Sequence, residues 1–321
     1  MSNVITRRRF LITAAATGAV LPLSRNLRAT AESSPVPKRK FYSILSLGRI
    51  GFHASFPESV ELAAKYGFEG LDPDANYFAS LDSDSLKRLL DDLQKRNLKF
   101  GAAGLPVEFR KDADTFNDGL KKLPAVAATL QRAGIWRVST WVLPSSNDLT
   151  YEQNFNQHTE RLRQCAKALA DHGQKLGLEY VAPRTLLRSQ KYQFIHNLNG
   201  MKKLIAAIGT KNIGVQLDSW HWFNAQETTK DLLTLRNSDI LTVDLNDAPK
   251  GLTLDQYQDN HRELPSATGV IPVQQFLDTL ARIGYDGPIQ AEPFSDTLKA
   301  MPIDQACAAT AAAMKKSFSL M

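Results

Sequence analysis

Short apolar segments alternate with longer amphipathic segments from Phe41 to the end of the chain. The apolar runs predict buried strands, and the segments between them, whose apolar residues recur every three or four positions, predict helices. The predicted strands are 42–47, 70–73, 100–105, 137–142, 178–181, 214–217, 240–245 and 288–291. The predicted helices are 57–66, 82–96, 113–133, 151–176, 200–208, 229–235, 273–283 and 304–317.

Strict alternation of strand and helix predicts an α/β fold with a parallel sheet, and eight such units can close into a (β/α)8 TIM barrel. An open, doubly wound sheet would require a glycine-rich phosphate-binding turn after an early strand. The turn at residues 48–51, Gly-Arg-Ile-Gly, lacks that spacing. The sequence therefore predicts a single TIM-barrel domain over residues 41–321.

Residues 1–31 have the pattern of a bacterial export signal. Arginines at 7–9 precede a moderately apolar run at 12–23, and Ala-Thr-Ala at 29–31 supplies small residues for cleavage after Ala31. The paired arginines indicate the twin-arginine route, and hence a periplasmic or secreted protein. An apolar run of about twelve residues is shorter than the roughly 20 that span a bilayer, so we expect no stable membrane anchor once the signal is cleaved. Polar, proline-containing residues 32–40 predict a flexible linker.

Removal of this signal changes the charge of the protein. The chain has 39 Lys and Arg against 33 Asp and Glu, a net charge of +6. Five of the arginines and none of the acids lie in residues 1–31, so the remaining chain has a net charge of +1. This near-neutral balance gives no indication of nucleic-acid binding. The two cysteines, Cys165 and Cys307, lie within predicted helices, and we expect both to be ordinary buried thiols.

Acidic residues lie at or next to the carboxyl ends of four consecutive predicted strands: Glu179, Asp218, Asp244 and Glu292. In a barrel these ends converge on one mouth. Four free carboxylates would repel each other strongly there, and a bound divalent cation would relieve the repulsion. Any one of the four can instead be a surface or salt-bridged acid, and Asp218 can cap a helix. An all-oxygen ligand set favours a hard cation such as Mn or Mg, with Ca also allowed.

Several motifs resemble the xylose isomerase-like barrels, in the sugar phosphate isomerase/epimerase group that includes tagatose/psicose-type epimerases. The resemblance covers residues 41–321. The motifs are YGFEGL at 66–71, LGLEYVAPRT at 176–185, QLDSWHW at 216–222, VDLNDAP at 243–249, DNHRELPSATGVI at 259–271 and AEPF at 291–294.

The resemblance implies a metal held by Glu179, Asp218, Asp244 and Glu292. Asp244 departs from the family pattern, which usually has a histidine in this place. An aspartate can still ligate a metal, but it adds negative charge and can also indicate a weakened or lost metal site.

The resemblance also implies proton transfer next to a sugar carbonyl, with Glu179 and Glu292 as the catalytic acid and base. His221 would bind a substrate hydroxyl, unless it only caps a helix or packs in the core. Arg262 would steer substrate oxygens, unless it is only a solvated loop residue. Aromatic residues near the mouth, Trp220 among them with Trp141, Trp222 and Phe294, would contact the sugar or pack in the core.

The resulting expectation is an exported, metal-dependent carbohydrate isomerase or epimerase acting on a small sugar without phosphate. Two alternatives stay open: an eliminase that cleaves an oxidised (keto) glycoside at the same site, and a sugar-binding barrel without catalysis. Barrels of this group often associate through helices, so a homo-oligomer is compatible with this expectation.

Overall fold

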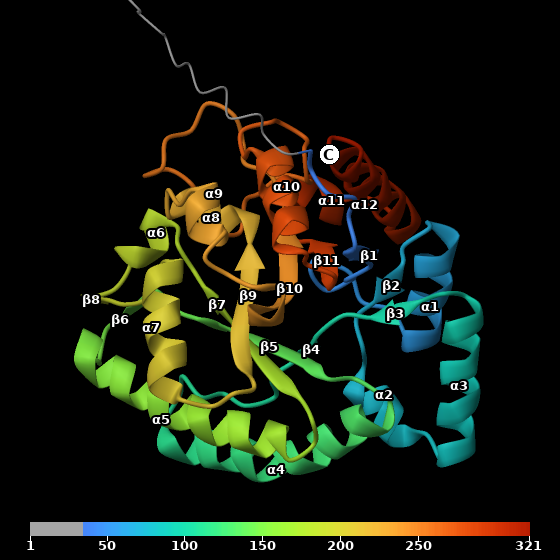
Figure 1. Cartoon of the computed structure of the whole chain (residues 1–321), viewed down its shortest axis with the longest axis horizontal. Helices are drawn as coiled ribbons and strands as arrows, with labels where there is room; N and C mark the ends of the chain where they lie inside the picture. The colour runs from blue at the N-terminus through green and yellow to red at the C-terminus, as the bar shows by residue number, and fades with distance from the viewer. Residues whose placement is uncertain (1–34) are drawn as a thin grey trace, which may run out of the picture. The chain divides into compact units, whose positions relative to one another are not determined.

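Parallel strands surround a common axis at the centre of the fold (Figure 1). The computed structural model describes residues 35–321, so the predicted export signal and positions 32–34 of the linker lie outside the described residues. The barrel strands are β1 (Tyr42–Ile44), β2 (Gly70–Leu71), β3 (Lys99–Phe100), β4 (Ala103–Gly104), β5 (Arg137–Val142), β7 (Lys175–Tyr180), β9 (Ile213–Asp218), β10 (Ile240–Leu245) and β11 (Pro288–Ala291).

Hydrogen bonds connect these strands around the whole barrel. One sheet has the order β1-β11-β10-β9-β7-β5-β4, and β2 pairs with β3. β3 and β4 are two parts of one interrupted strand. The first part, β3, pairs with β2, and the second part, β4, pairs with β5. The circle closes between β1 and β2, where the Glu69 N–H donates to the Ser43 carbonyl at 2.8 Å and the Leu45 N–H donates to the Gly70 carbonyl at 2.9 Å. The predicted (β/α)8 barrel is confirmed.

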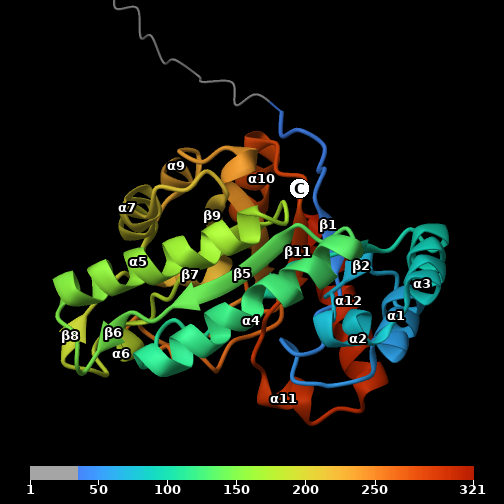
Figure 2. The same ribbon diagram turned by 90° about the horizontal axis from the view of Figure 1, so that it is seen from below.

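Helices surround the barrel strands (Figures 1 and 2). They are α1 (Phe56–Lys65), α2 (Ala75–Ser80), α3 (Ser83–Lys95), α4 (Ala113–Arg132), α5 (Tyr151–Ala170), α6 (Arg184–Leu187), α7 (Leu198–Ile208), α8 (Ser219–Asn224), α9 (Thr229–Leu232), the 3-10 helix η1 (Asn237–Asp239), α10 (Val273–Ile283), α11 (Asp296–Lys299) and α12 (Ile303–Phe318). In the described part of the chain, no helix has the length and apolar character needed to cross a membrane.

Local sequence signals fix the ends of several helices. Ser55 caps α1 in a capping box with Glu58, and Thr150 and Gln153 do the same for α5. Helix α5 ends at Ala170, six residues before its predicted end. Gly173 adopts a φ of 73°, which turns the chain out of the helix and lets β7 begin at Lys175.

Two further features are not predicted by the hydrophobic pattern. A short antiparallel two-stranded sheet pairs β6 (Ser145–Ser146) with β8 (Tyr192–Gln193) beside the barrel. The short helices α2, α6, α8 and α11 contain too few turns to give a helical period in the sequence, whereas α9 lies within the helix predicted at 229–235. The long loop after β10, predicted at residues 246–271, is present, and α10 follows it.

Candidate functional site

Four acidic side chains converge at the carboxyl ends of neighbouring strands, as predicted. Glu179 lies in β7, Asp218 ends β9, Asp244 lies in β10 and Glu292 directly follows β11. All four are buried, with exposed fractions of at most 6%. Oxygen atoms of Glu179, Asp244 and Glu292 lie within 4.8 Å of one another, and Glu179, Asp218 and His221 form a second such group.

Arg262 lies between two of these carboxylates. Its Nη1 donates to Asp218 Oδ2 and to Glu292 Oε2, each at 2.7 Å. Its Nη2 donates to Asp259 Oδ1 at 2.9 Å, and its Nε donates to the Asp259 carbonyl at 2.7 Å. Only 1% of the Arg262 side chain is exposed, so this guanidinium is an interior cation of the site rather than a solvated loop residue.

Asp247 fixes the loop that carries Arg262. Its backbone forms two hydrogen bonds of 2.9 Å with Glu263, directly after Arg262. Its carboxylate accepts the N–H groups of Gly269 at 2.7 Å and Ile271 at 2.9 Å. These hydrogen bonds connect Asp247 to several points of the loop, and they thereby fix the position of Arg262.

Arg49, in the turn after β1, is a second cation of the site, and the sequence analysis does not identify it. Its Nη1 lies 3.1 Å from Asp244 Oδ1 and also forms an ion pair with Glu292 Oε1. The only sequence signal is an arginine between glycines at 48–51, directly after the first strand. Its partners Asp244 and Glu292 lie 195 and 243 residues further along the chain (244 − 49 and 292 − 49), a separation that no local pattern spans.

Asp244 is surrounded by hydrogen-bond donors. Gln216 Nε2 donates to its Oδ2 at 2.6 Å, and Gln290 Nε2 donates to its Oδ1 at 2.8 Å. Burial raises the pKa of Asp244 well above its usual range, against the opposing effect of the nearby Arg49. Both oxygens of the residue that replaces the expected histidine are thus already bound by protein groups.

His221, in the first turn of α8, faces the acidic cluster. Its Nε2 lies 3.5 Å from Asp218 Oδ2 and 4.0 Å from Glu179 Oε1. Burial lowers the pKa of His221 to about 4, so the ring is neutral at pH 7. The Ala182 N–H donates to Nδ1 at 3.3 Å, which assigns the ring proton to Nε2 and directs it toward the acids.

Glu179 differs from the other three acids because one of its oxygens is unpaired. Its Oε1 is buried and has no hydrogen-bond partner among the described residues. Burial raises the pKa of Glu179 well above its usual range, and the neighbouring carboxylates of Glu292 and Asp244 raise it further. A buried carboxylate with a free oxygen and a raised pKa is suited to accept a proton from a bound molecule.

A cavity of about 420 Å³ at the mouth of the barrel is lined by Glu179, Glu292, His221 and the two arginines, whereas Asp218 and Asp244 lie behind its lining. Trp141 and Phe294 form part of its wall. Arg110 lies 4.2 Å from the centre of the Trp141 ring, and Arg262 lies 4.7 Å from the centre of the Phe294 ring. Phe294 has a φ of 40°, a strained backbone conformation that is often found at functional sites.

Two of the predicted aromatic residues do not reach this cavity. Trp220 is fully buried, and Arg262 lies 5.3 Å from the centre of its ring. Trp222 is buried against Phe276. The expectation that Trp220 contacts substrate therefore does not fit the structure, because Trp220 supports Arg262 from the side away from the cavity.

The cluster has the donor atoms to bind a metal. Arg49 and Arg262 contribute two positive charges, whereas Glu179, Asp218, Asp244, Asp259 and Glu292 contribute five negative charges when all are ionised. The free oxygen of Glu179 and this excess of negative charge both fit a cation. An ion shared by Asp218 Oδ2 and Glu292 Oε2 would have to displace the Arg262 nitrogen that now lies between them.

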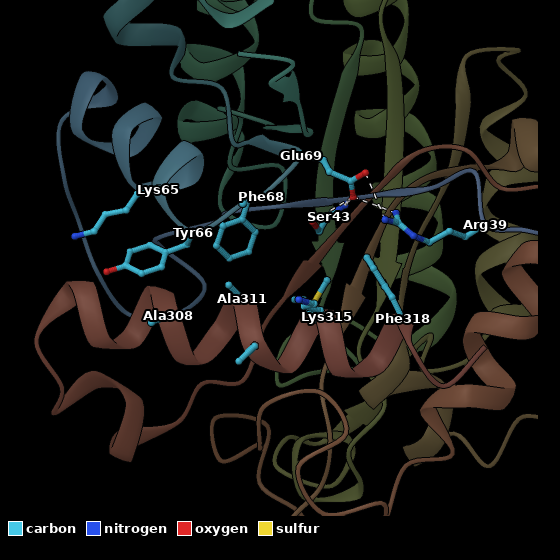
Figure 3. Close-up of a pocket in the computed structure, with 13 residues that line it drawn as sticks. Arg39, Ser43, Lys65, Tyr66, Phe68, Glu69, Ala308, Ala311, Lys315 and Phe318 are labelled. Atoms are coloured by element: carbon cyan, nitrogen blue, oxygen red, sulfur yellow. Dashed lines mark hydrogen bonds and ion pairs between the residues drawn. The ribbon is translucent and has the colours of Figure 1, made fainter.

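A larger cavity of about 590 Å³ lies at the opposite, amino-terminal ends of β1 and β2 (Figure 3). Arg39 and Glu69 point toward each other on one side of it, and Lys65 and Tyr66 lie on the other (Figure 3). The residues at this end of a barrel support stability rather than chemistry. The smaller cavity with the acidic cluster is therefore the candidate active site.

Comparison with known proteins agrees with the barrel fold. Residues 60–317 match the family model described as xylose isomerase-like TIM barrel. No curated protein matches the sequence. A xylose isomerase domain protein from Alicyclobacillus acidocaldarius is 28% identical, with a TM-score of 0.76 over 87% of this chain and 99% of that chain.

Two more distant structures share the fold. The IOLI protein, with a bound zinc atom, is 17% identical, with a TM-score of 0.71 over 87% of this chain and 98% of that chain. The D-psicose 3-epimerase of Clostridium cellulolyticum H10, solved with D-tagatose, is 16% identical, with a TM-score of 0.65 over 87% and 99%. At these identities the likeness extends to the fold alone.

Proposed function

Because the chain belongs to the xylose isomerase-like TIM barrel family, we propose that it is an enzyme that moves a proton at a carbon next to the carbonyl group of a carbohydrate. The reaction is an isomerisation or an epimerisation, depending on which carbon receives the proton. The observation that carries this proposal is the buried, unpaired Oε1 of Glu179 beside the cavity. Such an atom is costly to bury unless a ligand uses it.

In this proposal Glu179 removes the proton and Glu292 returns one. The electrons of the broken C–H bond form a carbon–carbon double bond, and the carbonyl oxygen gains negative charge. Arg49 supplies positive charge for that oxygen, and the neutral His221 donates its Nε2–H to a substrate oxygen. Preorganised donors of this kind stabilise developing charge without reorganisation.

The proposed ligands of a divalent metal are Glu179, Asp218, Asp244 and Glu292. A carboxylate-only set favours a hard cation, so we expect Mn or Mg. When bound, such an ion would polarise the substrate carbonyl and lower the barrier to proton removal. Arg262 would then move away from Asp218 and Glu292 and remain available to the substrate.

The proposed substrate is a small carbohydrate without phosphate. The sequence has no glycine-rich phosphate-binding motif, and the proposed export of the protein through residues 1–31 separates it from phosphorylated cytoplasmic intermediates. We place the mature protein in the periplasm or outside the cell. Elimination from an oxidised glycoside would use the same base, and it remains the alternative reaction at this site.

A sugar-binding barrel without catalysis is the second candidate function. The observation that favours it is that the two arginines already pair with Asp218, Asp244 and Glu292. Among the four acids in the described structure, only Glu179 then has a buried, unpaired oxygen. A binding protein needs such a fixed, neutralised site but needs no free base.

The two functions are separated by product formation. Purified mature protein, loaded with Mn or Mg, would be incubated with a panel of ketoses, aldoses and keto-glycosides, and products resolved by NMR. We expect a new isomer, epimer or cleavage product, lost in Glu179→Gln and retained in Glu108→Gln, a glutamate paired with Arg110 near the mouth but outside the cavity lining. Tight sugar binding with no product would favour the binding protein.

A further inference from the structure

A second cavity of about 440 Å³ adjoins the candidate active site. It lies at the carboxyl ends of β1, β2 and β4, on the same side of the barrel as the acidic cluster. The two cavities share three lining residues, Gly48, Asp72 and Gly104. They are therefore neighbouring compartments of one mouth, and these three residues mark the junction.

The two glycines keep this junction open. A Cβ atom added to Gly48 or Gly104 would meet no other described atom within 4 Å, and neither glycine has a positive φ. By contrast, a Cβ at the nearby Gly101 would lie 2.3 Å from the side chain of Ile44, so packing explains that glycine. Neither backbone conformation nor packing requires glycine at 48 and 104, and a side chain larger than a methyl group at either position would narrow the passage between the two cavities.

The second cavity has the chemistry of a site for a neutral, hydroxyl-rich ring. Its described lining residues include no lysine or arginine, which argues against a phosphate or carboxylate ligand. The carboxylates of Asp72 and Asp74 offer acceptors for hydroxyl groups, and Asn76 offers both donors and acceptors. Phe52 and Phe56 contribute aromatic surface for the C–H groups of such a ring.

We propose that the substrate is a glycoside of two rings, with the reacting ring beside Glu179 and a second sugar ring in the cavity lined by Phe52 and Asn76. This inference rests on the proposed function and extends it by naming the substrate class. The bond between the rings lies at the junction. Asp72, whose carboxylate accepts a hydrogen bond from the Ser46 hydroxyl, lies at this junction and can accept hydrogen bonds from the hydroxyl groups that flank the linking oxygen.

The test compares the affinities of monosaccharides with those of the disaccharides built from them, measured by isothermal titration calorimetry. For at least one pair we expect the intact protein to bind the disaccharide about tenfold or more tightly than its monosaccharide. In Gly104→Val the ratio should fall toward one, because the new side chain enters the junction. Gly104→Ala is the matched control and should keep most of the ratio, and Asn76→Ala should lower it without touching the junction.

Three results would overturn the proposal. The first is that no disaccharide binds more tightly than its monosaccharide, and the second is that the affinity ratio is unchanged in both Gly104→Val and Asn76→Ala. The third is that a phenyl glycoside binds more tightly than every disaccharide. Unchanged urea midpoints would show that the variants are folded. Because the readout is binding, it is independent of catalysis. If the protein prefers disaccharides but forms no product from the panel of sugars, the proposed enzymatic activity is refuted, whereas the proposed two-ring binding site is supported.

Discussion

Replacing Arg262 by methionine removes the cation that joins three carboxylates inside the barrel. The guanidinium makes two bonds of 2.7 Å to Asp218 and Glu292 and one of 2.9 Å to Asp259, with 1% of its side chain exposed. Breaking a buried ion pair from one side typically costs about 3–5 kcal/mol, because the remaining charges stay buried without a partner. We therefore expect Arg262→Met to lower the free energy of unfolding by about 3–5 kcal/mol at pH 7.5 with EDTA present.

The assay is urea unfolding followed by circular dichroism, with Arg236→Met as the control. Arg236 also pairs with an aspartate, Asp239 at 2.9 Å, but 81% of its side chain is exposed, so its loss should cost less than about 1 kcal/mol. Addition of Mn should restore much of the stability of Arg262→Met, since an ion can then use the oxygens that the guanidinium has left.

Two results would overturn this expectation. One is an unfolding free energy of Arg262→Met within about 1 kcal/mol of that of the native protein, the range of an exposed pair. The other is an equal stabilisation of the native protein and the variant by Mn. The first result would mean that the carboxylates are neutral without the arginine. The second would mean that Arg262 and the metal do not share ligands.

Three further predictions concern single side chains. The pKa of Glu179 is raised in the folded state, so folding favours the protonated carboxyl group. This group therefore contributes stability below about pH 4.3, its unfolded pKa, and the contribution is lost as the pH rises through the folded pKa. In metal-free protein at pH 8, Glu179→Gln should therefore unfold at higher urea than the native protein, and this advantage should shrink toward pH 4. Cys165 and Cys307 are buried and burial raises the pKa of both thiols, to about 12 and about 11, so a thiol reagent should label them only after unfolding. Gly214→Ala should lower the free energy of unfolding by about 1–3 kcal/mol in thermal or urea unfolding, because its Cβ would lie 2.4 Å from a backbone oxygen, whereas Gly104→Ala should be nearly neutral.

The barrel and its acidic cluster could be predicted because both follow from periodic features of the sequence. Alternating apolar and amphipathic segments determine the order of strands and helices, and barrel geometry brings strand ends together regardless of their separation. Glu179, Asp218, Asp244 and Glu292 therefore converge as expected. Helix ends were less predictable, as at α5, where a single positive-φ glycine decides the boundary.

The charge balance of the site could not be predicted in this way. Arg49 and Arg262 lie in loops, and their contacts depend on three-dimensional loop paths rather than on local patterns. The sequence suggests a metal, or salt bridges to unnamed partners, as the way to relieve the repulsion among the carboxylates, and the structure shows that two arginines offset part of it. The sequence also leaves open whether Trp220 contacts the sugar or packs in the core, since a residue just past a strand can face either the mouth or the core, and the structure shows it buried.

The central claim is that Glu179 exchanges a proton with a carbon atom of a bound sugar. The most direct measurement is solvent-deuterium incorporation next to the carbonyl, followed by NMR in D2O with the metal-loaded protein and the ketose or keto-glycoside that it binds. We predict deuterium at that carbon with the native protein, and none above background with Glu179→Gln although the variant still binds the sugar. Bound sugar that gains no deuterium with the native protein, or gains it equally fast with Glu179→Gln, would contradict the account.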